Sequence, residues 1–173
     1  MKKPIKPVEM DHFRRSPIRM LLADHEEITR LLIQFERAWE ARLKMSLAEA
    51  VLEELAIHAA ILEEVLYPAV REKAPGAPWL DRAEDLHRSI KRTIAELEEM
   101  NEYDERFEAH FARLTAQVRE HIRLEEMEML FKTASLGLKW DALGRRMLQL
   151  RKKLLSQLRN STFEAALTGN DVW

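Results

Sequence analysis

The chain contains the stretches His58-AAILEEVLYP and His121-IRLEEMEMLF, and both have the same design. In each, a histidine opens an acidic segment whose apolar residues recur at helical spacing. A further histidine precedes each stretch by a similar distance: His25 comes 33 residues before His58, and His87 comes 34 residues before His121. This spacing indicates two antiparallel helix pairs, each with two inward histidines. Four imidazoles can then surround one point inside a four-helix bundle, which is how such bundles hold metal ions.

The remaining sequence predicts long helices joined by short links. Only 4 glycines and 6 prolines occur among 173 residues, and no segment reads as a strand. Ser16-Pro17 is typical of a helix start, and Ser46-Leu-Ala-Glu49 has the form of a capping box. Pro75-Gly76-Ala77-Pro78 must end a helix. Helices are therefore expected over residues 17–43, 46–70, 79–100, 104–133 and 140–158.

Four long helices with short links predict an all-α fold, an antiparallel up-down-up-down four-helix bundle with an additional C-terminal helix. We expect an N-terminal arm over residues 1–15, the bundle and its fifth helix over 16–158, and a C-terminal tail over 159–173. The apolar residues of the fifth helix are Trp140, Leu143, Met147, Leu150 and Leu154. The basic residues assigned to its other face are Arg145, Arg146, Arg151 and Lys152. This helix is expected to cover the bundle, and a homodimer interface is the alternative.

The composition excludes several kinds of site and partner. There is no cysteine, which excludes disulfides, thiolate zinc sites and cysteine nucleophiles. The net charge of −2 gives no reason to expect nucleic acid, and no apolar run approaches the roughly 20 residues of a membrane span. The N-terminus lacks the apolar core of a signal peptide, so a soluble cytoplasmic protein is expected. Histidine and carboxylate ligands would suit iron, manganese or zinc.

Four histidines and one glutamate fall near one level of the predicted bundle. A rise of 1.5 Å per residue puts His25 and His87 about 12 Å in from their shared end, and His58 and His121 about 18 Å in. Glu125, one turn after His121, lies about 12 Å in and on the same helix face. These five residues are the candidate metal ligands.

The other two histidines do not belong to this level. His12 is in the N-terminal arm, and His110 lies about 16 Å from His121 along its helix. A lone histidine on an apolar face is usually a hydrogen-bonded core residue. A metal site is therefore indicated by the four histidines together and not by any one of them.

These segments resemble the hemerythrin-like, or HHE cation-binding, proteins of bacteria. The matching segments are Leu-Ala-Asp-His25-Glu-Glu-Ile, His58-AAILEEVLYP, Asp-Leu-His87-Arg-Ser-Ile and His121-IRLEEMEMLF. The resemblance, over residues 17 to 155, implies an antiparallel four-helix bundle with a non-haem di-iron centre. The ligands that it implies are His25, His58, His87, His121 and Glu125. It also implies a small ligand such as dioxygen, peroxide or nitric oxide, in sensing, storage or oxidation, and leaves open whether the protein is an enzyme.

The chain departs from this family at Leu62. Both HxxxE motifs of the family normally supply a carboxylate that bridges the two irons, and Tyr67-Pro68 fix the register that puts Leu62 in such a place. Glu63 is not expected to replace it, because at 100° per residue it points about 140° away from His58. Two divalent ions beside a single carboxylate would leave uncompensated buried charge.

Three ways of meeting this deficit stay open. Glu54 or Glu84 supplies the carboxylate, an exogenous oxo, hydroxo or carboxylate bridge supplies the charge, or the site holds one metal ion or none. Lys91, one turn after His87, would repel a second metal if it faced inward. The leading hypothesis is a non-haem iron protein, di-iron in preference to mononuclear iron, zinc or manganese. The alternative is a metal-poor or mononuclear helical bundle that acts as an interaction or regulatory module.

Overall fold

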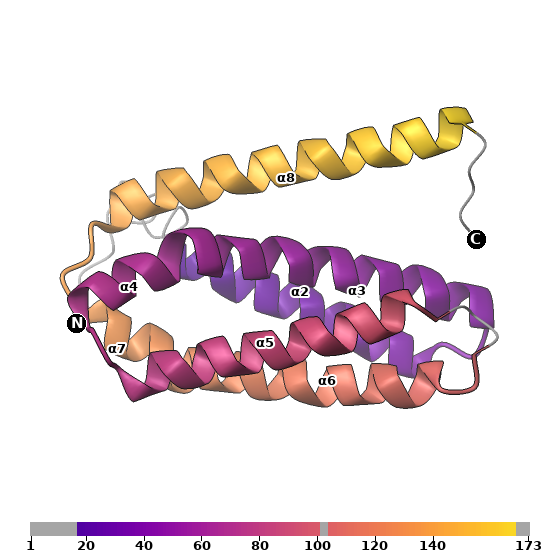
Figure 1. Ribbon diagram of the computed structural model, residues 1–173, viewed down its shortest axis with the longest axis horizontal. Coiled ribbons are helices and arrows are strands. Elements are labelled where there is room, and N and C mark those ends of the chain that lie inside the picture. The colour runs from indigo at the N-terminus through magenta and orange to yellow at the C-terminus, as the bar shows by residue number, and fades with distance from the viewer. Residues whose placement is uncertain (1–16, 101–103, 169–173) are drawn as a thin grey trace, which may run out of the picture.

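A computed structural model describes residues 17–100 and 104–168, and this part of the chain is an all-helical bundle (Figure 1). The α-helices are α2 (Pro17–Arg37), α3 (Ala41–Ile61), α4 (Tyr67–Lys73), α5 (Pro78–Glu98), α6 (Phe107–Leu124), α7 (Leu130–Ala134) and α8 (Trp140–Thr168). Two π-helical segments, η1 (Leu62–Leu66) and η2 (Glu125–Met129), continue α3 into α4 and α6 into α7. Helix α2 packs against α3, and α5 packs against α6. The predicted bundle with an additional C-terminal helix is confirmed.

The four histidines form a polar layer that divides the apolar core in two. On each helix the histidine separates residues of one cluster from residues of the other: on α2, for example, His25 stands between Leu21 and Ile28. One cluster is built around η1, η2 and α8, and the other reaches the turns at the opposite end. A buried polar layer costs free energy unless its groups are paired with each other or with a ligand.

Helix α8 covers one side of the bundle, along α2, α3 and η1. Leu143 and Met147 are buried in the cluster around η1, and Leu150 and Leu154 pack against it. The helix continues to Thr168, beyond the end expected at residue 158. Within the part of the chain that the structure describes, no helix has the length and hydropathy of a membrane span.

The boundary between the first two helices differs from the prediction. Helix α2 ends at Arg37 instead of residue 43, and α3 already begins at Ala41. Ser46 is therefore inside α3, where its hydroxyl donates to the carbonyl of Arg42 at 3.2 Å instead of capping a helix start. The turn between them has no glycine or proline to mark the boundary between the two helices. The predicted N-terminal arm, with His12, lies outside the described residues.

The π-helical segments are the main unpredicted feature of the backbone. The amide of Tyr67 donates to the carbonyl of Leu62, and the amide of Leu130 donates to the carbonyl of Glu125, both from five residues further on. Pro68 follows η1, but no proline follows η2, so proline is not their shared cause. Each segment begins four residues after a histidine, His58 or His121. Such wide turns are rare and are found mostly at functional sites.

Candidate metal centre

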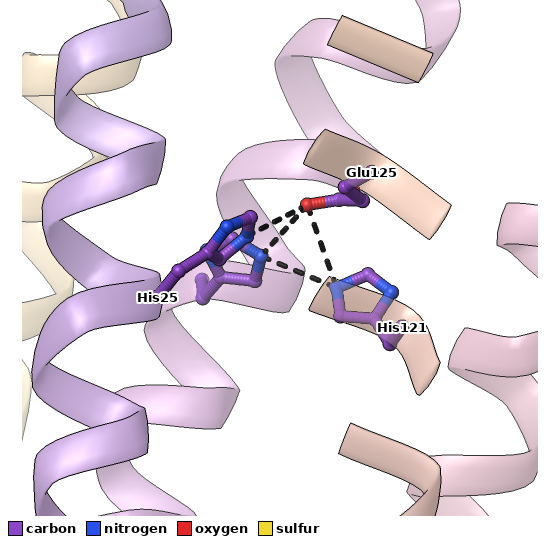
Figure 2. Close-up of side chains that lie close together, drawn as sticks. His25, His121 and Glu125 are labelled. Carbon is purple, nitrogen blue, oxygen red and sulfur yellow. Dashed lines mark hydrogen bonds and ion pairs between the residues drawn. The ribbon is translucent and has the colours of Figure 1, made fainter. Parts of the chain in front are cut away.

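His25, His58, His121 and Glu125 bring their side chains to one point in the interior. One ligand atom from each of the four lies within 4.8 Å of the others. Each of these side chains is at most 2% exposed. Figure 2 shows His25 and His121 pointing towards the same carboxylate oxygen of Glu125. Three imidazole nitrogens and a carboxylate oxygen form a donor set for a divalent metal ion.

The spacing of the donor atoms fits a metal ion. The Oε2 atom of Glu125 lies 3.0 Å from His25 Nε2, 3.4 Å from His58 Nε2 and 3.5 Å from His121 Nε2. The Nε2 atoms of His58 and His121 are 3.4 Å apart. Around one ion with bonds of about 2.1 Å, tetrahedral donors lie about 3.4 Å apart.

The fourth histidine borders this group. His87 Nε2 lies 3.2 Å from His121 Nε2, and its side chain is buried. It is not one of the four residues with mutually close donors, but its inner nitrogen adds a fifth donor beside them. The structure therefore brings together all five residues that the sequence suggested as ligands.

Carboxylates hold the outer nitrogens of three of the four imidazoles. His25 Nδ1 lies 2.9 Å from Glu126, His58 Nδ1 lies 3.3 Å from Asp24, and His87 Nδ1 lies 3.3 Å from Glu63. A carboxylate on the outer nitrogen fixes the tautomer and turns the inner lone pair towards a metal. Histidines that only filled the core would not require a carboxylate at the outer nitrogens of three rings.

Two of these carboxylates, Glu63 and Glu126, belong to the π-helical segments η1 and η2. Glu126 follows His121 by five residues and Glu63 follows His58 by five, and each contacts a histidine of a neighbouring helix. Glu63 does not take the place of a ligand at position 62, because it is not among the four converging donors. Its carboxylate contacts the outer nitrogen of His87 instead.

The two helix pairs are related by an internal correspondence that fails at two positions. Leu62 corresponds to Glu125, four residues after a histidine, and it is fully buried in the apolar cluster around η1. Leu86 corresponds to Asp24, one residue before a histidine. Asp24 contacts His58, but His121 Nδ1 is buried without a hydrogen-bond partner. Each half of the site therefore lacks one carboxylate that the other half has.

Charge in the cluster is unevenly distributed. Burial opposes a charge on His58, but hydrogen bonds to Asp24 and Glu125 outweigh it and raise its pKa to about 9. Burial lowers the pKa of His121 to about 3, and the neighbouring imidazoles add to this effect. Burial would raise the pKa of Glu125, but the surrounding histidines hold it well below its usual value. Glu125 is thus an anion that a metal would meet already ionised.

Tyr67 is a further polar group at the site. Its hydroxyl donates to Oε1 of Glu125 at 3.2 Å, which leaves Oε2 facing the histidines. Burial, followed by the charge of Glu125, raises its pKa well above the usual value, so the phenol keeps its proton. Sequence reasoning used Tyr67 only to fix the register of the motif.

Other suggested residues lie elsewhere. The carboxylate of Glu84 pairs with Arg71 at 2.9 Å and not with the cluster. Glu54 is not among the converging donors, although burial, reinforced by nearby Asp24, raises its pKa. Lys91 does not face the metal position, because it is largely exposed and pairs with Glu63. His110 contacts the carbonyl of Arg106 at 2.9 Å, away from the site.

Sequence reasoning missed the residues behind the ligands. These are Asp24, Glu63, Glu126 and Arg151, together with the role of Tyr67. The adjacency of Asp24 to His25 was a usable signal, because neighbours on a helix point about 100° apart and can reach different partners. The sequence held no comparable signal for Glu63 and Glu126, which contact histidines of neighbouring helices.

One cavity connects the site to the surface between α3 and α5. It measures about 320 Å³, and its lining includes His58, His87 and His121. Its apolar lining residues are Leu55, Ala56, Ala59, Ala60, Ile90, Ile94 and Ala95. Glu63 and Lys91, which form an ion pair, also line it. A small molecule can therefore approach the imidazoles along a mainly apolar path.

Comparisons with known proteins agree with this geometry. A family model described as Hemerythrin HHE cation binding domain matches residues 16–132. The fold is similar to the crystal structure of a hemerythrin HHE cation binding domain-containing protein from Mycobacterium kansasii, with a TM-score of 0.65 and 21% sequence identity. That similarity covers 83% of this chain and 92% of the other, and at this identity it shows the fold alone. Among curated proteins, none matches significantly.

Proposed function

Because the chain belongs to the hemerythrin HHE cation-binding family, we propose that its buried cluster binds non-haem iron, preferably two ions, and engages dioxygen, peroxide or nitric oxide. His25, His58, His87 and His121 would hold the iron through imidazole nitrogens, and Glu125 would hold it through its carboxylate. Iron held by imidazole and carboxylate supplies one-electron redox chemistry and positions open to a small ligand.

The observation that carries this proposal is the inward convergence of imidazole nitrogens whose outer nitrogens are held by carboxylates. Asp24, Glu63 and Glu126 hold His58, His87 and His25, respectively. In a structural zinc site, four protein ligands occupy every coordination position. This cluster instead adjoins a cavity that leads to the surface. The cavity favours a centre that meets small molecules.

The chain's own residues prepare the site for such a ligand. Tyr67 keeps one oxygen of Glu125 occupied, so the other stays directed at the imidazoles. The lining of the cavity is mainly apolar, which suits a small uncharged molecule. The carboxylate of Glu63 contacts the outer nitrogen of His87 and so orients the ring, and it also pairs with Lys91.

A mononuclear site is the second candidate, and one observation favours it. His58, His121 and Glu125 have donor atoms 3.4 to 3.5 Å apart, which fits one tetrahedral ion. With Leu62 in place of a second carboxylate, one ion of iron, zinc or manganese is better balanced in charge than two.

Metal analysis of protein purified after growth in iron-rich medium tests the proposal. About two iron ions per chain, with near-ultraviolet absorption that responds to peroxide, is the expected result. One ion per chain would select the mononuclear site. No metal after both iron-rich growth and reconstitution would overturn the proposal and favour a metal-poor interaction module.

A further inference from the structure

Asp24 is a buried carboxylate that joins the metal cluster to the C-terminal helix. It is 4% exposed, and its Oδ2 atom lies 3.3 Å from His58 Nδ1. The same oxygen accepts a hydrogen bond from Nη2 of Arg151 on α8. Asp24 therefore connects Arg151, 127 residues away in sequence, to a proposed metal ligand.

Arg151 is directed into the protein, contrary to its assignment to the outer face of α8. Its side chain is 18% exposed, and its Nε atom is buried without a hydrogen-bond partner. Buried Met147, one turn earlier, holds this part of α8 against the bundle. Burial of a guanidinium is costly unless it is paired, so the contact with Asp24 is what retains it there.

The other half of the site has no such arrangement. Leu86 stands at the position that corresponds to Asp24, and the outer nitrogen of His121 has no partner. The pairing of Arg151 with Asp24 thus serves one imidazole, on the side of the bundle that α8 covers. General stabilisation of the bundle would not require this specificity.

We infer that Arg151 is a positioning residue of the metal centre, which acts on His58 through Asp24. The guanidinium fixes the orientation of the Asp24 carboxylate, and the carboxylate accepts a hydrogen bond from the protonated Nδ1 of His58. The inner nitrogen of His58 then carries its lone pair towards the metal position. Arg151 also offsets the repulsion between Asp24 and nearby Glu54. The inference rests on the proposed metal binding, and it makes α8 part of the centre.

The test compares Arg151→Met with Arg146→Met, a matched change at an exposed arginine of the same helix. Titration of metal-free protein with Co²⁺, whose visible spectrum reports its ligands, gives the affinity. We expect Arg151→Met to weaken binding by about 10- to 100-fold, as for loss of other groups behind metal ligands. Arg151→Lys should recover part of that loss, and Arg146→Met should bind as the parent does. Equal affinity in Arg151→Met and the parent would overturn the inference.

A second measurement separates positioning from support of the fold. Nitrogen chemical shifts of the His58 ring in metal-free protein, recorded at a pH above its pKa of about 9, report which nitrogen of the neutral ring carries the proton. We expect Arg151→Met to change the His58 signals and to leave those of His87 unchanged. If Arg151→Met does not fold, the same measurement is made on Arg151→Gln, which is a milder change. Unchanged His58 signals in a folded variant would contradict the inference. If the parent binds no Co²⁺ or iron, the proposed function fails, whereas the ring signals still decide whether Arg151 acts on His58.

Discussion

His58 and His121 occupy corresponding places in the two helix pairs but have opposite electrostatic surroundings. Asp24 and Glu125 both contact His58, whereas His121 has a carboxylate neighbour only at its inner nitrogen. The first imidazole therefore favours its charged form and the second its neutral form. A metal ion needs both in the neutral form, so it must displace a proton from His58.

These opposite shifts predict a stability maximum near pH 6.5 for the metal-free protein. The raised pKa of His58 stabilises the fold below pH 6.5, and this contribution is lost as the pH rises towards 9. The lowered pKa of His121 stabilises the fold above pH 6.5, and this contribution is lost as the pH falls towards 3. The loss on the alkaline side should be on the order of 3 kcal/mol. Urea unfolding of chelator-treated protein at several pH values measures it.

The control for this pH dependence is His58→Gln. This variant should lose the alkaline decline between pH 6.5 and 9 and keep the decline below pH 6.5. An equal alkaline decline in the parent and in His58→Gln would show that another group is responsible.

Leu62 is the second position at which a single residue is expected to determine a property of the site, here the number of metal ions that it holds. We expect Leu62→Glu to raise the iron content towards two ions per chain, because it restores the carboxylate that corresponds to Glu125. Without metal, the new buried carboxylate should destabilise the protein by about 2 to 7 kcal/mol. Metal analysis and chelator-dependent thermal unfolding measure the two effects.

Leu62→Gln is the matched variant for this change. It has a similar shape but no charge, so it should destabilise the protein without recruiting iron. If Leu62→Glu behaves in the same way, position 62 does not face the metal, and the argument from the internal correspondence fails.

At the scale of the helices, the π-helical segments η1 and η2 adjoin the site and include Glu63, Glu125 and Glu126. The sequence allowed the helices and the inward faces of the histidines to be predicted, because apolar residues recur around them with a 3.6-residue period. The same period did not reveal that Glu63 and Glu126 contact histidines of neighbouring helices, because it describes one helix at a time. It also placed Arg151 outside, because a charged residue in an amphipathic helix usually faces solvent.

Deletion of Met127 tests the role of η2. Met127 is 75% exposed in this segment, so its removal should let the wide turn relax to an α-helical turn with little loss of packing. Glu126 would then rotate away from His25. We expect the variant to stay folded but to bind metal about 10- to 100-fold more weakly. Circular dichroism and a Co²⁺ titration measure the two outcomes.

The comparison for this deletion is Glu126→Gln, which loses the charge that holds His25 but keeps the wide turn. A similar loss of affinity in both variants would assign the effect to Glu126. Parent-like affinity after deletion of Met127 would show that the π-helical turn does not position the ligands.

At the scale of the whole molecule, the polar layer and the cavity between α3 and α5 belong together. The layer of histidines interrupts the core between two apolar clusters, and the cavity connects that layer to the surface. Helix α8 packs along α2, α3 and η1 (Figure 1), and none of the described residues that line the cavity belongs to α8. The cluster is thus covered on the α8 side and adjoins the cavity between α3 and α5.

Ala60→Leu tests this path. Ala60 lines the cavity and is not itself a candidate ligand, so a larger side chain there should narrow the approach and leave the donors in place. We expect Co²⁺ affinity to stay within about twofold of the parent, while azide binds to the iron-loaded protein at least tenfold more slowly. Stopped-flow absorbance measures this rate.

Ala109→Leu, on the exposed face of α6, is the control and should leave both the Co²⁺ affinity and the azide-binding rate unchanged. Unchanged azide kinetics in Ala60→Leu would mean that ligands reach the centre by a different opening, and a fall in Co²⁺ affinity would mean that the ligands themselves had moved.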